Sequence, residues 1–421
     1  MSKTFTGFGF GPIQSALFLY EAWASGNFSR LVVAEVDKTV VAAVRNNHGR
    51  YVVNIARRER VDRAEVGPVE ILNPLDPTDR RQLVAAVAES SELATALPSV
   101  DFFDRGESSV AAVLAEGLLA RRDIPAPVIY AAENHNHAAE ILAEAVARRA
   151  GGRVPGNPVF LNTVIGKMSG VLTDPAEIAA LGLVTLTPGF PRAVLVEEFN
   201  RILVSRPSSP EVRRGIGVFA EKDDLLPFEE AKLYGHNAIH ALLGYLAARK
   251  GYATLAGAGR DPELVGVARE AFLHESGAAL VAKYARLGDA LFTPEGFRAY
   301  AEDLLDRMTR PTLHDRVDRV IRDPARKLGW NDRIFGTMRR ALSQGITPRR
   351  MALGAAAAIM HLAARPGEAG PAAHLFRDSG ALTPAAVEKI LRALWGREAD
   401  ALAPRLVALT VGAMEVVDRD W

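Results

Sequence analysis

The sequence predicts an α/β N-terminal half with a mainly parallel sheet, followed by a mostly α-helical C-terminal half. Up to about residue 200, short β-branched runs alternate with Ala- and Leu-rich segments of helical period. Beyond that point the strand signal fades, and the apolar segments have helical length and are bounded by Pro and Gly. The expected domains are therefore 1–200 and 201–421, with the boundary between Val196 and Pro207 and an enzyme site between the two.

The individual elements follow from these two patterns. In the first half, strands are expected at Thr4–Phe8, Leu31–Glu35, Val69–Leu72, Leu93–Ala96, Val128–Ala131 and Ala193–Val196. The helices between them include Pro12–Ser25, Asp79–Ala88 and Asn136–Ala150. In the second half, helices are expected at Glu229–Arg249, Asp261–Leu273, Pro294–Met308, Thr347–Ala363 and Pro384–Trp395. The small side chains at 354–358 also predict a close approach of neighbouring helices.

The composition excludes several classes of protein. With 51 Lys and Arg against 50 Asp and Glu, the formal net charge is +1, which leaves no overall field to attract nucleic acid or an acidic membrane surface. The absence of cysteine excludes disulfides, thiolate zinc sites and cysteine nucleophiles. The chain start lacks a signal-peptide pattern, and the apolar stretch at 351–364 is too short to span a bilayer. We therefore expect a cytoplasmic protein without nucleic acid or membrane partners.

A glycine-rich turn follows the first expected strand. The segment Gly9-Phe10-Gly11-Pro12-Ile13 joins that strand to a helix, where glycines allow backbone N–H groups to approach a pyrophosphate. Pro12 suits the first helical turn because its missing donor would be unpaired there anyway. Gln14 stands where the third glycine of the usual spacing would be. An ordinary tight turn is the alternative, but the strand before and the helix after favour a Rossmann-type dinucleotide site formed by Gly9, Gly11, Pro12 and Ile13.

Glu35 predicts which dinucleotide is bound. It closes the next expected strand, at about the usual interval of ~20 residues from the glycines. A carboxylate there accepts hydrogen bonds from the ribose hydroxyls and repels a 2′-phosphate, which favours NAD over NADP. A solvated strand end is the alternative interpretation, and Lys38 or Arg45 nearby would soften the discrimination.

Three polar residues interrupt an apolar helix in the second half. Asn237 and His240 share a face at i, i+3, and Lys232 lies about 80° round the helix from His240 at ~100° per residue, so the three side chains can converge. Apolar surroundings would lower the pKa of Lys232, and a neutral amine can act as a general base. His240 would orient a hydroxyl, and the Asn237 amide would donate to a developing oxyanion. A satisfied polar patch in a helix interface is the alternative, and the spacing alone does not decide between them.

Polar residues also follow the strand expected at Val128–Ala131. Ligands of open α/β sheets collect beyond the carboxyl ends of the strands, where Asn134 would lie as a hydrogen-bond donor at the reaction centre. A helix cap is the alternative role for Asn134. A metal site built from Glu133, His135 and His137 is rejected, because alternating residues in a loop diverge and no second ligand motif is apparent.

Taken in order, these motifs resemble the polyol-specific long-chain dehydrogenases, the mannitol dehydrogenase family. The resemblance covers most of the chain, and the matching segments are 8–14, 34–37, 129–134, 162–167, 232–240, 275–280, 318–328, 331–333 and 354–361. It implies a Rossmann domain, a helical domain with the site in the cleft between them, NAD as cofactor and a metal-independent reaction. Hydride would pass directly between the carbinol carbon and nicotinamide C4.

The resemblance also implies roles for the polar residues. Lys232 would be the general base in alcohol oxidation and the acid in ketone reduction. Asn134 and Asn237 would hold the alkoxide-like oxygen, and His240 would position the substrate hydroxyl. Two positions depart from the family pattern: Gln14 in the glycine turn, and Ala96–Ser99 in place of an apolar-Gly-Pro turn. A catalytically silent NAD-binding protein therefore stays open as an alternative.

A local basic region bears on the substrate. Residues 305–350 hold 12 Lys and Arg against 5 acids, although some of these cations would form a solvated face with Asp315 and Asp318 as partners. Arg307 falls where the family keeps an arginine near the substrate, and Arg326-Lys327 resembles the branch that acts on sugar phosphates. The expected reaction is the interconversion of mannitol 1-phosphate and fructose 6-phosphate. A free polyol or a hexuronate is the alternative substrate, and the oligomeric state is not predicted.

Overall fold

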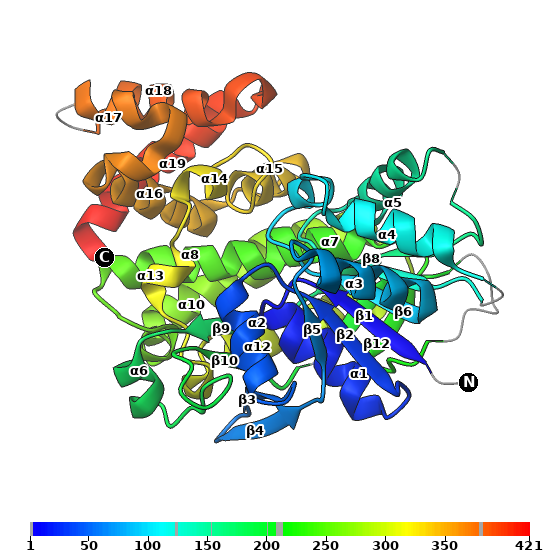
Figure 1. Ribbon diagram of the computed structural model, residues 1–421. Helices are drawn as coiled ribbons and strands as arrows, with labels where there is room; N and C mark the ends of the chain where they lie inside the picture. Colours follow the sequence, from blue (N-terminus) through cyan, green and yellow to red (C-terminus); the bar gives the residue numbers. More distant parts are fainter. Residues whose placement is uncertain (1–2, 123–124, 153, 200, 208–213, 379–381) are drawn as a thin grey trace. The chain divides into compact units, whose positions relative to one another are not determined.

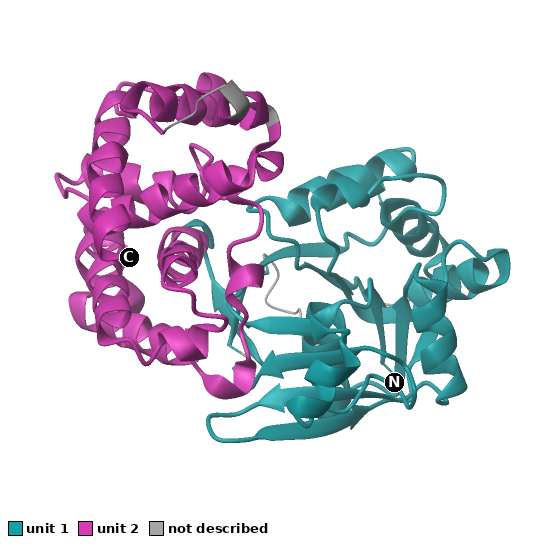
Figure 2. Ribbon diagram, turned by 90° about the vertical axis from the view of Figure 1, so that its left-hand side faces the viewer, with its two compact units in different colours: residues 1–226 teal, residues 227–421 magenta. Residues whose placement is uncertain are grey.

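The computed structural model describes residues 3–122, 125–152, 154–199, 201–207, 214–378 and 382–421 (Figure 1). The chain divides into two compact units, Met1–Leu226 and Pro227–Trp421, coloured separately in Figure 2. The structural boundary lies later than the expected one at about residue 200. The reason is that β11 (Ile202–Ser205) and β12 (Phe219–Lys222) pair with strands of the first unit.

An eight-stranded, mainly parallel sheet organises the described part of unit 1. Its spatial order is β12, β11, β8 (Val159–Ile165), β7 (Val128–Ala131), β6 (Ser90–Thr95), β1 (Thr4–Phe8), β2 (Arg30–Ala34) and β5 (Glu70–Leu72). From β8 to β5 every neighbouring pair is parallel, and the pairing of β11 with β8 is antiparallel. The strands are added outward from β1 through β2 to β5, and then on the other side of β1 from β6 onward, so the carboxyl ends of β1 and β6 flank the point where open α/β sheets bind ligands.

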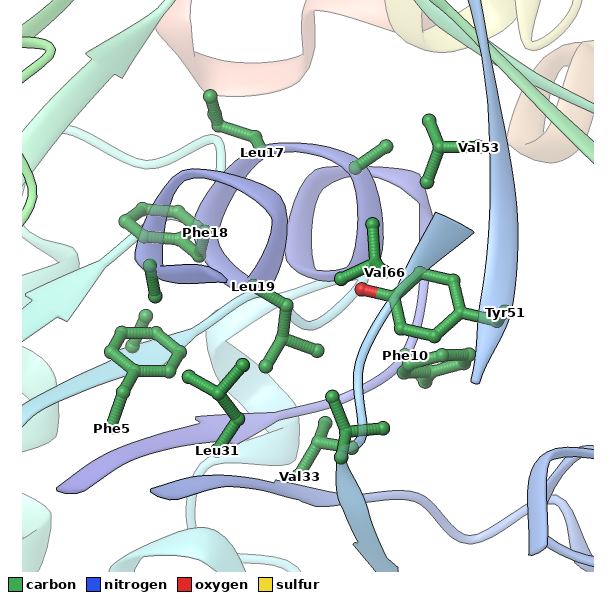
Figure 3. Packing of buried hydrophobic residues seen from close by; sticks show 14 of the residues in the cluster. Phe5, Phe10, Leu17, Phe18, Leu19, Leu31, Val33, Tyr51, Val53 and Val66 are labelled. Atoms are coloured by element: carbon green, nitrogen blue, oxygen red, sulfur yellow. The ribbon is translucent and has the colours of Figure 1, made fainter. Parts of the chain in front are cut away.

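The two faces of this sheet are covered by different layers. On β2, Leu31 and Val33 belong to one apolar cluster, whereas Val32 and Ala34 belong to another, because successive side chains of a strand point to opposite faces. The second cluster is completed by α3 (Pro77–Glu89), α4 (Val110–Ala120) and α5 (Ala138–Arg149). The first contains residues of the helical segment after β1, with Phe5 and Leu31 packed below Leu17, Phe18 and Leu19 in Figure 3.

A smaller, four-stranded sheet contributes side chains to the first apolar cluster. Its order is β4 (Val61–Val66), β3 (Tyr51–Ala56), β10 (Ala193–Glu197) and β9 (Ser169–Leu172). Tyr51 of β3 packs edge to face on Phe10 with ring centroids 5.0 Å apart, and its hydroxyl donates to the Ser15 carbonyl at 2.7 Å (Figure 3). The buried Phe10–Tyr51 pair thereby fixes the glycine turn against β3.

Unit 2, in its described residues, consists of helices joined by turns and loops, with an isolated antiparallel bridge between Thr254 and Arg316. Its elements are η3 (Ala231–His236), α8 (Asn237–Arg249), α9 (Leu255–Ala258), α10 (Pro262–Ala271), η4 (Phe272–Gly277), α11 (Ala278–Tyr284), η5 (Ala290–Phe292), α12 (Pro294–Met308), η6 (Pro311–Leu313), α13 (Val317–Val320), α14 (Pro324–Lys327), α15 (Phe335–Ser343), α16 (Arg349–Ala364), η7 (Pro366–Ala372), α17 (Ala373–Asp378), α18 (Pro384–Trp395), η8 (Gly396–Glu398) and α19 (Ala403–Asp420), and α7 (Leu226–Glu230) leads into them. As predicted, a small residue lets helices approach closely: a Cβ added at Gly354 of α16 would lie 2.8 Å from Leu242 Cδ1 of α8.

The predicted fold class is confirmed: a mainly parallel, Rossmann-like α/β region precedes a helical region. The elements that sequence analysis missed include β3, β4, β8, β9, β11 and β12, and the strand expected at Ala193–Val196 lies in the smaller sheet. In the described residues, no helix combines the length and apolarity needed to cross a membrane.

Candidate active site

The glycine turn of unit 1 has the shape of a dinucleotide cradle. Gly9 has φ +82°, and a Cβ there would lie 2.9 Å from the Ala96 carbonyl oxygen, so glycine is required for conformation and for space. At Gly11, by contrast, an added Cβ would meet no heavy atom of the described residues within 4 Å. Pro12 and Ile13 begin the helical segment that continues as η1 (Gln14–Phe18) and α1 (Leu19–Ser25). The open space at Gly11, at a helix start, fits a pyrophosphate.

Glu35 lies at the end of β2 and holds the turn. Its Oε2 accepts from the Phe10 N–H at 2.8 Å, and its Oε1 accepts from the Asp37 N–H at 2.8 Å. Each carboxylate oxygen has a further lone pair, so these two bonds leave acceptor capacity for ribose hydroxyls. Glu35 therefore fits the predicted cofactor role and also fixes the position of the turn.

Gln14 is accommodated by an unusual glycine in the strand. Its side chain is fully buried and lies over Gly7 of β1, where an added Cβ would be only 2.1 Å from Gln14 Nε2. In the usual pattern the glycine is in the helix, whereas here it is in the strand that the helix packs against. Neither amide atom of Gln14 has a hydrogen-bond partner among the described residues. Gly7 in β1 thus makes room for the Gln14 side chain, and Gln14 does not fill the space at Gly11.

Asn134 is exposed in the loop that follows β7. It does not cap α5, whose N-cap is His137. Its neighbour Glu133 is buried, with Oε1 accepting from Leu97 N–H at 2.8 Å and Oε2 from the Thr95 hydroxyl at 2.9 Å. Burial raises the pKa of Glu133 to about 7. Glu133 therefore fastens the loop that carries Asn134 to the turn after β6.

Metal ligation was rejected for this loop on the sequence. The His135 and His137 ring centroids are 6.2 Å apart and at 63° to each other. Among the described residues, no group of three or more His, Cys, Asp and Glu could hold a metal ion.

In unit 2, Lys232 lies on a π-helical turn. The segments α7, η3 and α8 follow one another directly, and Asn237 N–H donates to the Lys232 carbonyl, a five-residue spacing that widens the helix. The side chains of Lys232, Asn237 and His240 are all half-buried. The spacing predicted from an unbroken α-helix therefore changes here, because the wide turn alters the angle between Lys232 and His240. Such turns occur frequently at functional sites.

His236 lies on the same turn and is buried. Burial moves the pKa of His236 well below its usual value, and the charges of His240, Arg307, Lys232 and Arg333 act in the same direction. The rings of His236 and His240 meet edge to face with centroids 6.1 Å apart. The structure thus packs His240 against a buried, neutral histidine that the sequence analysis did not single out, and the charges of Lys232 and Arg307 act on the same ring.

The electrostatics of Lys232 match the predicted role of a base. Burial lowers its pKa from 10.5 to about 8, the Arg333 charge adds to this, and Glu229 opposes it. Arg333 was also missed by the sequence analysis. Its Nε donates to Asp332 Oδ1 at 2.7 Å, and its charge acts on Lys232, His236 and Lys327. The Arg333 charge therefore lowers the pKa of Lys232 and also that of Lys327, in the basic region 305–350.

The predicted substrate-binding cations differ in burial. Arg307 is buried, and its Nη1 donates to Asp303 Oδ2 at 3.1 Å. Lys327 is buried as well, and burial lowers its pKa to about 7, with the charges of Arg333 and Arg326 adding to the effect. Arg326 is 53% exposed and pairs with acids at 3.4 and 3.8 Å. Of the three, Arg307 and Lys327 are buried and Arg326 is exposed, and Arg307 also pairs with an exposed acid, Asp303.

Much of the basic excess between 305 and 350 is paired. The ion pairs include Arg310–Asp306, Arg316–Asp318, Arg319–Asp315, Arg333–Asp332, Arg339–Asp400 and Arg340–Glu230. The two acids that the sequence offered as partners, Asp315 and Asp318, are among them. Arg307 is paired as well, with Asp303, so burial rather than the lack of an ionic partner distinguishes Arg307 and Lys327 as candidates for anion binding.

Asp315 contacts His240 across a separation of 75 residues. His240 Nε2 lies 2.8 Å from Asp315 Oδ2, and Arg319 Nη2 donates to Oδ1 at 2.6 Å. The Asp315 side chain has no exposed surface. Burial would raise the pKa of Asp315, but His240 and Arg319 outweigh it and hold that pKa at about 2.

Comparisons with known proteins place the chain in a family. The model that matches is the mannitol dehydrogenase C-terminal domain, over residues 224–393. A mannitol-1-phosphate 5-dehydrogenase of Pseudarthrobacter chlorophenolicus is 32% identical over 292 residues, 67% of each chain. Another, of Bacillus licheniformis, is 31% identical over 340 residues, 78% of this chain and 80% of that protein. The chain belongs to the mannitol dehydrogenase family.

Two solved structures of dehydrogenases share the fold. A D-sorbitol dehydrogenase in substrate-free form matches with a TM-score of 0.76 at 16% identity, over 100% of this chain and 94% of that one. The mannitol 2-dehydrogenase of Pseudomonas fluorescens, in a ternary complex with NAD and D-mannitol, matches with a TM-score of 0.67 at 17% identity, over 100% and 92%. The predicted family and the prediction of an oxidoreductase are thereby confirmed.

Proposed function

We propose that this member of the mannitol dehydrogenase family interconverts mannitol 1-phosphate and fructose 6-phosphate with NAD(H), in the cytoplasm. The observation that carries the proposal is Lys232, half-buried beside His236 and Arg333 with its pKa lowered to about 8. At pH 7 such a lysine is neutral in about one molecule in ten, against about three in ten thousand at a pKa of 10.5. The amine is therefore available as a base near neutral pH and as an acid in the reverse direction.

The residues act as follows during oxidation. Lys232 Nζ takes the proton of the reacting hydroxyl, while the side-chain amides of Asn237 and of Asn134 donate to the oxygen as negative charge develops on it. His240 accepts from a neighbouring hydroxyl and fixes the substrate's orientation. In the reduction of the ketone, the protonated Lys232 returns its proton to the same oxygen.

The cofactor side of the proposal rests on unit 1. Bound NAD supplies the hydride acceptor at nicotinamide C4. The open space at Gly11 and the helix that begins at Pro12 would receive its pyrophosphate, with Gly9 and Ile13 shaping the turn. Glu35 would accept from the ribose hydroxyls and disfavour a 2′-phosphate.

Two observations support a phosphorylated substrate. The curated relatives that match at about 30% identity are named as mannitol-1-phosphate 5-dehydrogenases. In unit 2, Arg307 and Lys327 are buried cations, with Arg326 next to Lys327 at the surface. A phosphate dianion beside Lys327 would raise the pKa of that lysine and restore its charge.

A substrate panel tests the proposal. The purified chain is given mannitol 1-phosphate, mannitol and sorbitol, each with NAD and with NADP, and a keto-hexuronate with NADH and with NADPH, and NADH or NADPH absorbance is followed. The highest kcat/KM is expected for mannitol 1-phosphate with NAD, and Lys232→Ala should abolish turnover while NAD binding is kept. A higher kcat/KM for an unphosphorylated substrate refutes the phosphate assignment. No turnover on any substrate refutes catalysis in favour of a silent NAD-binding protein.

A further inference from the structure

The backbone on both sides of Asp315 holds this residue against His240. Asp315 follows His314, which has φ +48°, a backbone conformation that few L-residues adopt. The Asp315 carbonyl accepts from Leu255 N–H at 2.8 Å, and Val317 N–H donates to the Ala253 carbonyl at 3.0 Å. A short antiparallel bridge thus fixes the Asp315 backbone against the segment that follows α8.

The carboxylate itself is fully engaged. Oδ2 lies 2.8 Å from His240 Nε2, and Oδ1 accepts from Arg319 Nη2 at 2.6 Å and from Nε at 3.1 Å. The side chain has no exposed surface, whereas those of His240 and Arg319 are 17% and 39% exposed. A buried carboxylate is stable only with such partners, because its desolvation is otherwise too costly. The buried Asp315 carboxylate therefore holds His240 and Arg319 in place, two side chains that are more exposed than Asp315 itself.

This contact determines which nitrogen of His240 carries the proton. A carboxylate without a proton can only accept, so Nε2 must be the donor in the contact. In the neutral ring the proton is then on Nε2, and Nδ1 keeps the lone pair. A substrate hydroxyl could then donate to Nδ1 of His240. In the other tautomer, with the proton on Nδ1, this nitrogen would be a donor and could not accept from the hydroxyl.

We propose that Asp315 is a positioning residue of the active site, which holds His240 as the Nε2–H tautomer so that Nδ1 accepts from a substrate hydroxyl, and which fixes Arg319 with its other oxygen. The proposal rests on the proposed function and adds a residue to it. Asp315 itself need not touch substrate, since it acts through His240 and Arg319. Carboxylates that orient a metal-ligating histidine typically contribute about 10- to 100-fold to activity, and we expect an effect of that order here.

The tautomer can be observed directly. The chain has nine histidines, so ¹⁵N-histidine labelling gives a tractable long-range ¹H–¹⁵N spectrum, in which His240→Gln identifies the His240 signals. The unmodified chain should show His240 with a protonated Nε2 and an unprotonated Nδ1. A protonated Nδ1 with a bare Nε2 overturns the proposal, and this measurement needs no Asp315 variant to fold.

Kinetics then test the consequence. Asp315→Asn keeps the size of the side chain and removes its charge, and it should lower kcat/KM for mannitol 1-phosphate by about 10- to 100-fold with the Kd for NAD unchanged. In a chain that already carries His240→Gln, Asp315→Asn should lower kcat/KM much less, because most of the effect of Asp315 passes through His240. The matched control is Asp318→Asn, which removes an exposed carboxylate paired with Arg316 and should leave kcat/KM within twofold.

The outcomes separate this proposal from the proposed function. If no polyol or polyol phosphate is oxidised by the unmodified chain, the proposed function fails, while the spectrum still decides whether Asp315 sets the tautomer. If turnover is present but Asp315→Asn matches the unmodified chain in both kcat/KM and the His240 spectrum, the positioning role is wrong and the proposed function stands.

Discussion

Replacing Lys232 by methionine should stabilise unit 2 while abolishing turnover. Methionine keeps the unbranched apolar stem and removes the amine. The folded-state pKa of Lys232 is about 8 and its ordinary value is 10.5, so the charged amine is less favourable in the folded chain than in the unfolded one. At 1.36 kcal/mol for each tenfold change in the proton equilibrium, the cost is on the order of 3 kcal/mol, as an upper bound because the side chain keeps some solvent contact.

The pH dependence of this cost has a definite sign. Below pH 8 Lys232 is protonated in both states, so the full cost is present. Between about pH 8 and 10.5 the unfolded chain binds the proton and the folded chain does not, so the cost falls as pH rises. The variant should therefore be more stable than the unmodified chain at pH 7, with the difference shrinking steadily towards pH 10.

Urea unfolding at pH 7 and pH 10 measures this difference. Lys250→Met is the matched control, because Lys250 pairs with Asp261 and Glu263 and these partners raise its pKa. The control should not gain stability at pH 7. Equal stability of Lys232→Met and the unmodified chain at both pH values would show that the amine is solvated, and the base assignment would lose its physical ground.

Three further predictions concern unit 1. Gly11→Ala should change the free energy of unfolding by less than about 0.5 kcal/mol, because its Cβ enters open space, but it should weaken NAD binding at least about tenfold in a fluorescence titration; unaltered affinity contradicts the cradle. Glu35→Gln should lower the ratio of NAD to NADP affinity about tenfold, and an unchanged ratio removes Glu35 from cofactor selection. Gly7→Ala should cost about 1–3 kcal/mol through its clash with Gln14, and Gln14→Ala in the same chain should recover most of it in thermal unfolding; no recovery refutes the exchange of glycine between strand and helix.

Local patterns gave the elements whose signals are local. Thr4–Phe8, Val128–Ala131, Pro294–Met308 and Pro384–Trp395 have the predicted bounds, since each is a continuous apolar or amphipathic run with a clear stop. The strand Val61–Val66 was missed because three charged side chains interrupt it, and it is held in place by pairing with β3. A single sequence carries little signal for such pairing.

The site was predicted to the extent that its residues are close in sequence. Lys232, Asn237 and His240 fall within nine positions, and a helix places them near one another. The sequence analysis did not single out His236, because its burial and the effects of the Arg307 and Arg333 charges on its pKa depend on the folded chain. Asp315 is 75 residues from His240, a pairing that only the packed helices reveal. The roles assigned to these residues stay predictions for the experiments above.

The wide turn at Ala231–His236 makes the chain more tolerant of a deletion there than in the regular helix that follows. A turn closed by a five-residue spacing holds one residue more than an α-helical turn. Loss of Leu233 would let the segment close into a regular helix, with the residues on either side keeping nearly the same angular position. Loss of Ala238 from α8 would instead rotate Lys232 by about 100° relative to His240.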